Sequence, residues 1–297
     1  MAINIYTGIK QLILTEEQLA NYYENKSLDK SIYEDENLYN NQYVLITYMK
    51  DENAKRFQDK YELLDVKKWN GNKLVKLKKT TVNNDYIKVR SLNLFQDCMV
   101  DVLSDDSITI KSFMGIPGGG KSYMSISYGL DRVLKGDFNK LVYVRNNVDI
   151  GDRNIGALPG DLEQKLDPIN EVLSDVLNRD SVDRLKIDKK IETPYIGFTV
   201  GRTYDNSWIV VDDCQQLSKT HVYNLTTRLG HNSVLCFCGD LFQTYSQKYE
   251  NNNSGISYLH EQLKGEKFFS CVHTKISERS ETAQRCAELL FDGIKEN

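Results

Sequence analysis

A glycine-rich segment that ends in lysine and serine contains the residue types with the clearest chemical meaning in this sequence. It fits the phosphate-loop pattern G-x-x-x-x-G-K-[ST]. Glycines let the backbone turn tightly and direct several N–H groups toward one point, where they can hold a polyphosphate. We expect Lys121 to contact the terminal phosphates and Ser122 to be a ligand of Mg²⁺. The residues of the segment are Gly115, Ile116, Pro117, Gly118, Gly119, Gly120, Lys121 and Ser122.

The residues on both sides of this segment have the pattern that a phosphate loop requires. An apolar, β-branched run over Ile108–Met114 predicts a strand before it. The alternative is a glycine-rich turn that carries a lysine by chance, which a strand before and a helix after the segment disfavour. The residues behind it predict an amphipathic helix, with apolar side chains at Tyr123, Met124, Ile126, Leu130, Val133 and Leu134.

Two adjacent acids follow a second apolar run. The run Trp208–Val211 predicts a buried parallel strand and ends in Asp212 and Asp213. An acid at the carboxyl end of a strand beside a phosphate loop holds Mg²⁺, which is the role we expect for Asp212. Asp213 would then orient or deprotonate an attacking water.

Three more polar residues are candidates for the same site. Arg145 ends the apolar run Leu141–Val144, at the edge where open α/β sheets bind ligands. Gln243 follows the apolar run 233–238 and is placed to sense a γ-phosphate. Arg279, just before a predicted last helix, is either a surface cation or an arginine that neutralises charge.

The order of the predicted elements indicates the fold class. From residue 93 onward strands and helices alternate, which predicts an α/β fold with a doubly wound, mostly parallel sheet and helices on both faces. The helix predicted over Asn93–Leu103 has an apolar stripe, and its spacing predicts that Gln96 is exposed. This domain covers residues 86–297. Its other predicted segments are a long polar loop over 145–161, a helix over 162–176, a charged surface segment over 178–192, a strand over 196–200 and a last helix over 281–294.

Residues 1–85 predict a small β-rich module with one helix. Thr15 has the position of a helix N-cap, and Gln42–Tyr48 predicts a strand. Asn70 and Gly71 separate two alternating segments, which predicts a hairpin. The hairpin is rich in lysine, so it is either a nucleic-acid or partner surface or a solvated face, and we favour the solvated face. The lysines are Lys67, Lys68, Lys73, Lys76, Lys78 and Lys79.

Composition narrows the class of protein. The net charge of −4 and the hydrophobic content of 40% are those of a soluble globular chain rather than a nucleic-acid polycation. The six cysteines lack a C-x-x-C pair or zinc spacing, which predicts buried thiols in a reducing compartment. No signal peptide or membrane-length apolar run is visible, so we expect a cytoplasmic protein with no membrane partner.

Together these motifs resemble the PhoH-like family of phosphate-loop ATPases, whose core is similar to that of superfamily-one helicases. The first 80 residues look like the linker that joins a PIN nuclease to the ATPase in longer members. The PIN domain has no counterpart here, so the resemblance implies an ATPase without its own nuclease. The matching segments, in the same order and spacing, are 93–96, 115–122, 156–165, 201–203, 210–215, 227–230, 239–243 and 254–255.

The resemblance implies roles that the residues alone leave open. Gln96 becomes an adenine contact, and Asn93, Tyr123 and Arg145 join it in the nucleotide site. Asp212 becomes the Mg²⁺-side acid and Gln243 the γ-phosphate sensor. Because family members form hexameric rings, Arg228 and Arg279 become candidates for contact with ATP in their own or a neighbouring subunit.

The sequence also departs from the family at three places. The usual Asp-Glu-Ala-Gln is Asp-Asp-Cys-Gln at 212–215, so Asp213 is one methylene shorter than the family's glutamate and hydrolysis is expected to be slow. The usual Arg-Pro is Arg145-Asn146, and Cys238 replaces a threonine.

Two functions from different classes fit these observations. The first is an Mg²⁺-dependent ATPase that acts on RNA or single-stranded DNA as a helicase or translocase. The second is a slow, nucleotide-gated oligomeric scaffold that docks onto another protein. A nuclease is disfavoured because the PIN domain is missing. A second motor domain does not fit in 297 residues, so unwinding would require oligomerisation or the N-terminal module. The abundance of Asn, Lys, Tyr and Ile is typical of an AT-rich genome, such as that of a phage.

Overall fold

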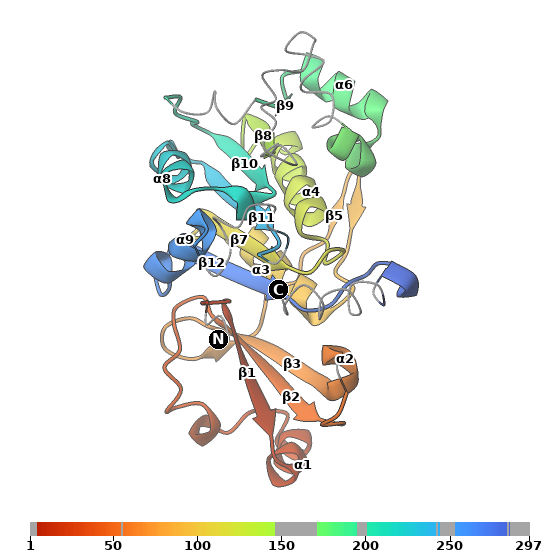
Figure 1. Cartoon of the computed structure of the whole chain (residues 1–297), viewed down its shortest axis with the longest axis vertical. Coiled ribbons are helices and arrows are strands. Elements are labelled where there is room, and N and C mark those ends of the chain that lie inside the picture. Colours follow the sequence, from red (N-terminus) through yellow and green to blue (C-terminus); the bar gives the residue numbers. More distant parts are fainter. Residues whose placement is uncertain are drawn as a thin grey trace.

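The described residues form a six-stranded and a four-stranded β-sheet, which lie one above the other in Figure 1, and a short two-stranded sheet, β5-β6. The structure is a computed structural model, and it describes residues 5–54, 56–145, 171–194, 201–241, 243, 253–283 and 285. The larger sheet carries the phosphate loop and the four-stranded one belongs to the N-terminal segment.

The larger sheet has six strands in the order β12-β7-β11-β10-β8-β9, and every neighbouring pair is parallel. All residues of β7, β10 and β11 are buried, which explains their apolar runs, because a parallel sheet is covered on both faces. The strands are β7 (Ile110–Gly115), β8 (Lys140–Arg145), β9 (Ile191–Glu192), β10 (Ser207–Asp212), β11 (Val234–Gly239) and β12 (Phe269–Thr274).

Helices cover both faces of this sheet, as the alternating pattern predicts (Figure 1). Side chains from alternate strand positions, such as Tyr143 and Val210, pack with α3 (Leu94–Leu103) and α4 (Lys121–Leu134). The intervening positions, such as Val144 and Val211, pack with α8 (Lys219–Thr227) and α9 (Gly255–Leu263). The prediction of a doubly wound α/β fold is therefore confirmed.

The N-terminal sheet has four strands, β1-β2-β3-β4, with β1 parallel to β2 and the other pairs antiparallel. The Thr15 cap and the hairpin at Asn70-Gly71 are confirmed, and Thr15 and Gln18 form a capping box. Residue 85 lies between the two short strands β5 and β6, and the domain boundary there stays a prediction. The elements are β1 (Ile9–Leu14), α1 (Glu16–Asn25), a 3₁₀ helix (Lys30–Ile32), β2 (Tyr43–Met49), α2 (Phe57–Lys60), β3 (Tyr61–Trp69), β4 (Leu74–Val75), β5 (Val82–Asn83) and β6 (Lys88–Val89).

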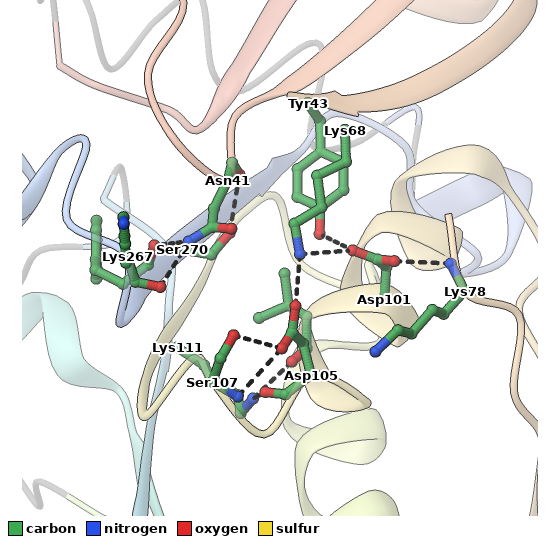
Figure 2. A network of polar contacts seen from close by, with 12 residues as sticks. Asn41, Tyr43, Lys68, Lys78, Asp101, Asp105, Ser107, Lys111, Lys267 and Ser270 are labelled. Carbon is green, nitrogen blue, oxygen red and sulfur yellow. Dashed lines mark hydrogen bonds and ion pairs between the residues drawn. The ribbon is translucent and has the colours of Figure 1, made fainter. Parts of the chain in front are cut away.

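A buried polar network joins the small sheet to α3 (Figure 2). The Tyr43 hydroxyl donates to Asp101 Oδ2 at 2.7 Å, and Lys68 Nζ lies 3.2 Å from the same oxygen. Lys68 Nζ also donates to Asp105 Oδ2 at 2.8 Å. At the edge of the large sheet, Asn41 Nδ2 donates to the carbonyl of Phe269 in β12 at 3.0 Å. The small sheet is thus attached through charged groups that are removed from water.

Two sequence predictions are corrected by the structure. Gln96 is buried, with 4% of its surface exposed, because the side of α3 away from the apolar stripe faces the phosphate loop. Residues 178–192 are not only charged surface, since they contain α6 (Arg179–Ile187) and β9 and bury Val182, Leu185 and Ile191.

Several predicted features lie wholly or partly outside the described residues. Residues 171–177 are helical as predicted, whereas the segments 146–170, 196–200 and 286–294 fall outside. The five cysteines in the described ranges are buried and form no disulfide. None of the helices that the structure describes is long and apolar enough to cross a membrane.

Lys68→Met tests the buried network at the junction. The substitution leaves Asp101 and Asp105 without their shared cation, and breaking a buried ion pair from one side costs about 3 kcal/mol or more. Urea unfolding should show that loss. Lys67→Met on the same strand is the matched control, because its ion pair with Asp65 is only partly buried and should contribute less, about 1 kcal/mol. Equal losses in both variants would contradict the assigned role of Lys68.

His260→Gln tests a buried imidazole that is coupled to pH. Burial lowers the pKa of His260 to about 4 from 6.5, and its ring nitrogens contact Tyr6 O and Ser112 Oγ. Between those pH values the unfolded chain binds a proton that the folded chain does not, so the free energy of unfolding falls as the pH falls. Gln should reduce that slope by about 1.4 kcal/mol per pH unit. The exposed His221→Gln should leave the slope unchanged, and an unchanged slope in His260→Gln would contradict the assignment.

Candidate functional site

A polar cavity of about 260 Å³ lies at the carboxyl ends of β7, β10 and β11. This is the edge of the sheet at which open α/β folds bind ligands. The cavity brings together most of the residues that the sequence predicted. It is lined by Pro117, Gly118, Gly120, Lys121, Ser122, Tyr123, Asp212, Asp213, Gln215, Gly239, Asp240, Gln243 and Arg279.

The phosphate loop connects β7 to α4, and two of its glycines are required by its geometry. Gly115 has φ +121°, and a Cβ there would lie 2.1 Å from the Thr274 carbonyl oxygen of β12. Gly120 has φ +83° and is the N-cap of α4, so the positive end of that helix is directed at the cavity. Gly115, Ile116 and Gly119 shape the loop without lining the cavity.

Lys121 is buried beneath the loop. Its Nζ donates to the carbonyls of Gly115 and Ile116, each at 2.8 Å. Burial lowers the pKa of Lys121, and the charge of Asp240 is the largest influence in the opposite direction. A charged phosphate oxygen is a stronger hydrogen-bond acceptor than a carbonyl oxygen. The two carbonyls therefore hold the ammonium group of Lys121 at the loop, and a bound phosphate would replace them as its acceptor.

The Ser122 hydroxyl and Asp212 meet as a magnesium site requires. Ser122 Oγ donates to Asp212 Oδ1 at 2.8 Å, and the Tyr143 hydroxyl donates to Asp212 Oδ2 at 2.8 Å. Burial and the charge of Asp213 raise the pKa of Asp212, while the hydrogen bonds from Ser122 and Tyr143 oppose that shift.

The oxygens at this point fit Mg²⁺. Within the described ranges no group of three or more His, Cys, Asp or Glu could hold a metal alone. A Mg²⁺ that shares its coordination with phosphates and waters needs only one or two protein oxygens, which Ser122 and Asp212 supply. A bound cation would favour the ionised form of Asp212, against the burial and the charge of Asp213 that raise its pKa.

Asp213 lines the cavity but is also held by an arginine. Its backbone is left-handed, with φ +52°, and its Oδ2 accepts from Arg145 Nε at 2.7 Å. Burial, the largest single influence, lowers the pKa of Arg145, but the contact with Asp213 and the nearby Tyr143 and Asp212 together raise it above its usual value. Arg145 reaches the site through this acid and does not itself line the cavity.

The segment after β12 lies across the phosphate loop. The Glu278 N–H donates to the Gly118 carbonyl at 3.0 Å, and Asn93 Nδ2 donates to Glu278 Oε1 at 2.5 Å. Arg279 follows and lines the cavity, close enough that a Cβ on Gly118 would lie 2.5 Å from its Cγ.

Gln96 supports the loop from α3. Its Nε2 donates to the Gly119 carbonyl at 3.3 Å, and its Oε1 accepts from the Leu92 N–H at 2.8 Å. Asn93 caps the same helix by accepting from the Gln96 N–H. Neither side chain lines the cavity, and the adenine contact implied for Gln96 stays a prediction.

Arg228 is another predicted site residue that does not line the cavity. It is exposed after the end of α8, where its carbonyl accepts from the Tyr204 N–H just before β10 begins. This is the opposite end of β10 from Asp212. A contact of Arg228 with a neighbouring subunit stays a prediction.

Three cavity residues were not among the predicted site residues. Gln215 Oε1 accepts from the Asp240 N–H at 3.2 Å, and its Nε2 donates to the Gln243 carbonyl at 3.3 Å. A Cβ on Gly239 would lie 2.4 Å from Gln215 Oε1, so this glycine makes room for the amide. The sequence contains a signal for two of these residues, because Gly239 ends the apolar strand β11 and an acid, Asp240, follows it directly.

Comparisons with known proteins agree with this geometry. Residues 87–290 match the family model described as PhoH-like protein. The chain is 27% identical to the PhoH2 protein of Bacillus subtilis over 301 residues, which cover 96% of this chain and 64% of that protein. It is 31% identical to a PhoH-like protein of Bacillus subtilis over 51% of this chain and 48% of the relative. A PhoH2 protein of Mycolicibacterium smegmatis is 28% identical over 68% of this chain and 47% of its own length. The chain thus spans between about half and two thirds of these curated relatives.

Tyr143→Phe tests how Asp212 is held. Without the hydroxyl, the carboxylate loses a hydrogen bond worth about 1 kcal/mol, and the pKa of Asp212 should rise further. Calorimetry with Mg²⁺ and ATP should show binding about fivefold weaker. As the pH is lowered, that binding should be lost at a higher pH than in the parent protein. Tyr128→Phe is the matched control, because its hydroxyl contacts Thr80. Identical Mg²⁺ dependence in the two variants would contradict the role of Tyr143.

Proposed function

The chain belongs to the PhoH-like family, and from this membership and the cavity geometry we propose that it is a Mg²⁺-dependent ATPase. The observation that carries the proposal is the 2.8 Å contact between Ser122 and Asp212, in a cavity that Lys121 and Asp213 also line. This constellation serves phosphoryl transfer, in which catalysis is mainly positioning and charge stabilisation.

Each side chain has a defined task in this proposal. The loop amides and Lys121 hold the polyphosphate, while Ser122 and Asp212 hold the metal. When bound, Mg²⁺ would neutralise charge on the β- and γ-phosphate oxygens. Asp213 accepts a hydrogen bond from the attacking water and orients it, and Arg279 stabilises the charge that develops on the transferred phosphoryl.

The proposed turnover is slow. Asp213 must reach the water with a shorter side chain than glutamate, and its carboxylate is already bonded to Arg145. Release of Arg145 from Asp213 therefore belongs to the reaction as we propose it.

We further propose that the ATPase acts on RNA or single-stranded DNA as a homo-oligomer in the form of a hexameric ring. The resemblance to a helicase-like core supports this proposal, and so does the position of Arg228, whose exposed side chain lies away from its own cavity. The second candidate is a nucleotide-gated scaffold with little turnover. The ion pair between Arg145 and Asp213 favours it specifically, since it occupies the acid needed for hydrolysis.

ATP hydrolysis measured with and without RNA tests the proposal. Lys121→Ala should lower the rate at least about 10²-fold, and Asp213→Asn should do the same while ATP still binds. Asp213→Glu should raise the rate, because it restores the longer acid. Stimulation by RNA that disappears in Lys121→Ala would favour the translocase. Tight ATP binding with negligible turnover, unchanged in Asp213→Glu, would favour the scaffold, and absence of ATP binding would refute both.

A further inference from the structure

The lysines of the N-terminal hairpin separate into two groups in the structure. Lys67 is paired with Asp65, Lys79 with Asp97, and Lys68 with Asp101 and Asp105. By contrast, Lys76 and Lys78 are exposed, and their ammonium groups pair with none of the acids in the described residues. The hairpin is therefore not a uniformly solvated face.

Lys76 and Lys78, two of the unpaired lysines, border a second cavity at the end of α3 away from the phosphate loop. It has a volume of about 370 Å³, within the size range of small-ligand sites, and lies between the hairpin and the residues that precede β7 and β12. Lys267, on the segment before β12, contributes a third ammonium group that has no acidic partner among the described residues. Lysines from two distant parts of the chain thus converge on one space.

The acids in this cavity do not cancel the three lysines. Asp101 accepts from the Tyr43 hydroxyl, from Lys68 Nζ and from the Lys78 backbone N–H, so both its oxygens are occupied (Figure 2). Asp105 is bonded to Lys68 and Ser107. Burial, which raises the pKa of Asp105, is outweighed by these bonds, which lower it to about 2. The fixed acids and Lys68 form the floor, and the surplus charge is positive.

Neutral groups complete the cavity wall. Asn70 Nδ2 has no hydrogen-bond partner in the part of the chain that the structure describes, since only its Oδ1 accepts, from the N–H groups of Asn72 and Lys73. Val75 and the methylene stems of the lysines offer an apolar surface. Ammonium groups, an amide donor and an apolar side together match a phosphate that is attached to a flat organic body.

We propose that this cavity binds a nucleotide unit, with its phosphate among Lys76, Lys78 and Lys267 and its sugar or base against Val75. The unit comes either from a single-stranded nucleic acid or from a free nucleotide. This site is separate from the ATP site and does not depend on hydrolysis. Helix α3 is one connection between this site and the phosphate loop, because its last turn holds Asp101 and its first turn holds Gln96.

The experiment uses the full chain with Lys121→Ala, so that binding at the phosphate loop does not contribute. A fluorescein-labelled ten-nucleotide oligouridylate is titrated by fluorescence anisotropy at several salt concentrations, and unlabelled uridine monophosphate is used as the competitor. Lys76→Gln with Lys78→Gln removes two cavity charges. Lys73→Gln with Lys88→Gln is the matched control, because both lysines are exposed, neither lines the cavity, and the change in net charge is the same.

The cavity pair should weaken binding of the oligonucleotide about tenfold at low salt, and the slope of log K against log salt should fall by about 0.7 for each lysine removed. The control pair should change neither quantity. Competition by the mononucleotide would assign the cavity to free nucleotides, and its absence would assign it to a strand. Three results would each overturn the proposal. They are equal effects of the two pairs, no effect of the cavity pair, and no binding of the oligonucleotide and mononucleotide to the Lys121→Ala chain. Circular dichroism checks that each pair is folded.

Discussion

The hydrogen bond between Ser122 and Asp212 is the contact on which the candidate site depends. It joins residues that are 90 positions apart, and it forms only because β11 lies between β7 and β10 in a parallel sheet. Parallel strands place all their carboxyl ends at one edge, so the start of α4 and the end of β10 meet there. Any change in strand order would separate the hydroxyl from the carboxylate. The sheet therefore acts as the frame of the site, and the buried apolar strands stabilise the position of its polar ends.

The charges at this edge are arranged so that no acid is left alone. Asp212 accepts two hydroxyl hydrogen bonds, Asp213 is paired with Arg145, and Asp240 lies near Lys121. Burial of an isolated carboxylate would cost several kcal/mol, and these partners offset part of that cost. The same partners define how the site can respond to an anion. A polyphosphate competes for Lys121, and a metal competes for the oxygens of Asp212.

The parts of the fold that could be predicted from sequence are those determined by local patterns. The phosphate loop, the apolar strands and the helix cap at Thr15 depend on neighbouring residues, and the structure contains them where the sequence indicated. Gln96 could not be placed in this way, because helical spacing shows only whether a side chain lies on the one apolar face of the helix. Here α3 is covered on a second side by the phosphate loop. The pairing of Lys68 and the distance of Arg228 from the cavity likewise follow from contacts between segments far apart in sequence.

Helix α3 is the element that gives the two ends of the molecule a common support. Its first turn contacts the phosphate loop through Gln96 and the segment after β12 through Asn93. Its last turn carries Asp101, to which the N-terminal sheet is attached, and Lys111 of β7 donates to the Val102 carbonyl at 2.6 Å. A helix of ten residues spans about 15 Å and is stiff over that length, so it moves as one body. A displacement that lengthened the bond between Gln96 and Gly119 would also strain the buried bonds at Asp101. The position of the N-terminal sheet and the shape of the phosphate loop are therefore not independent of each other.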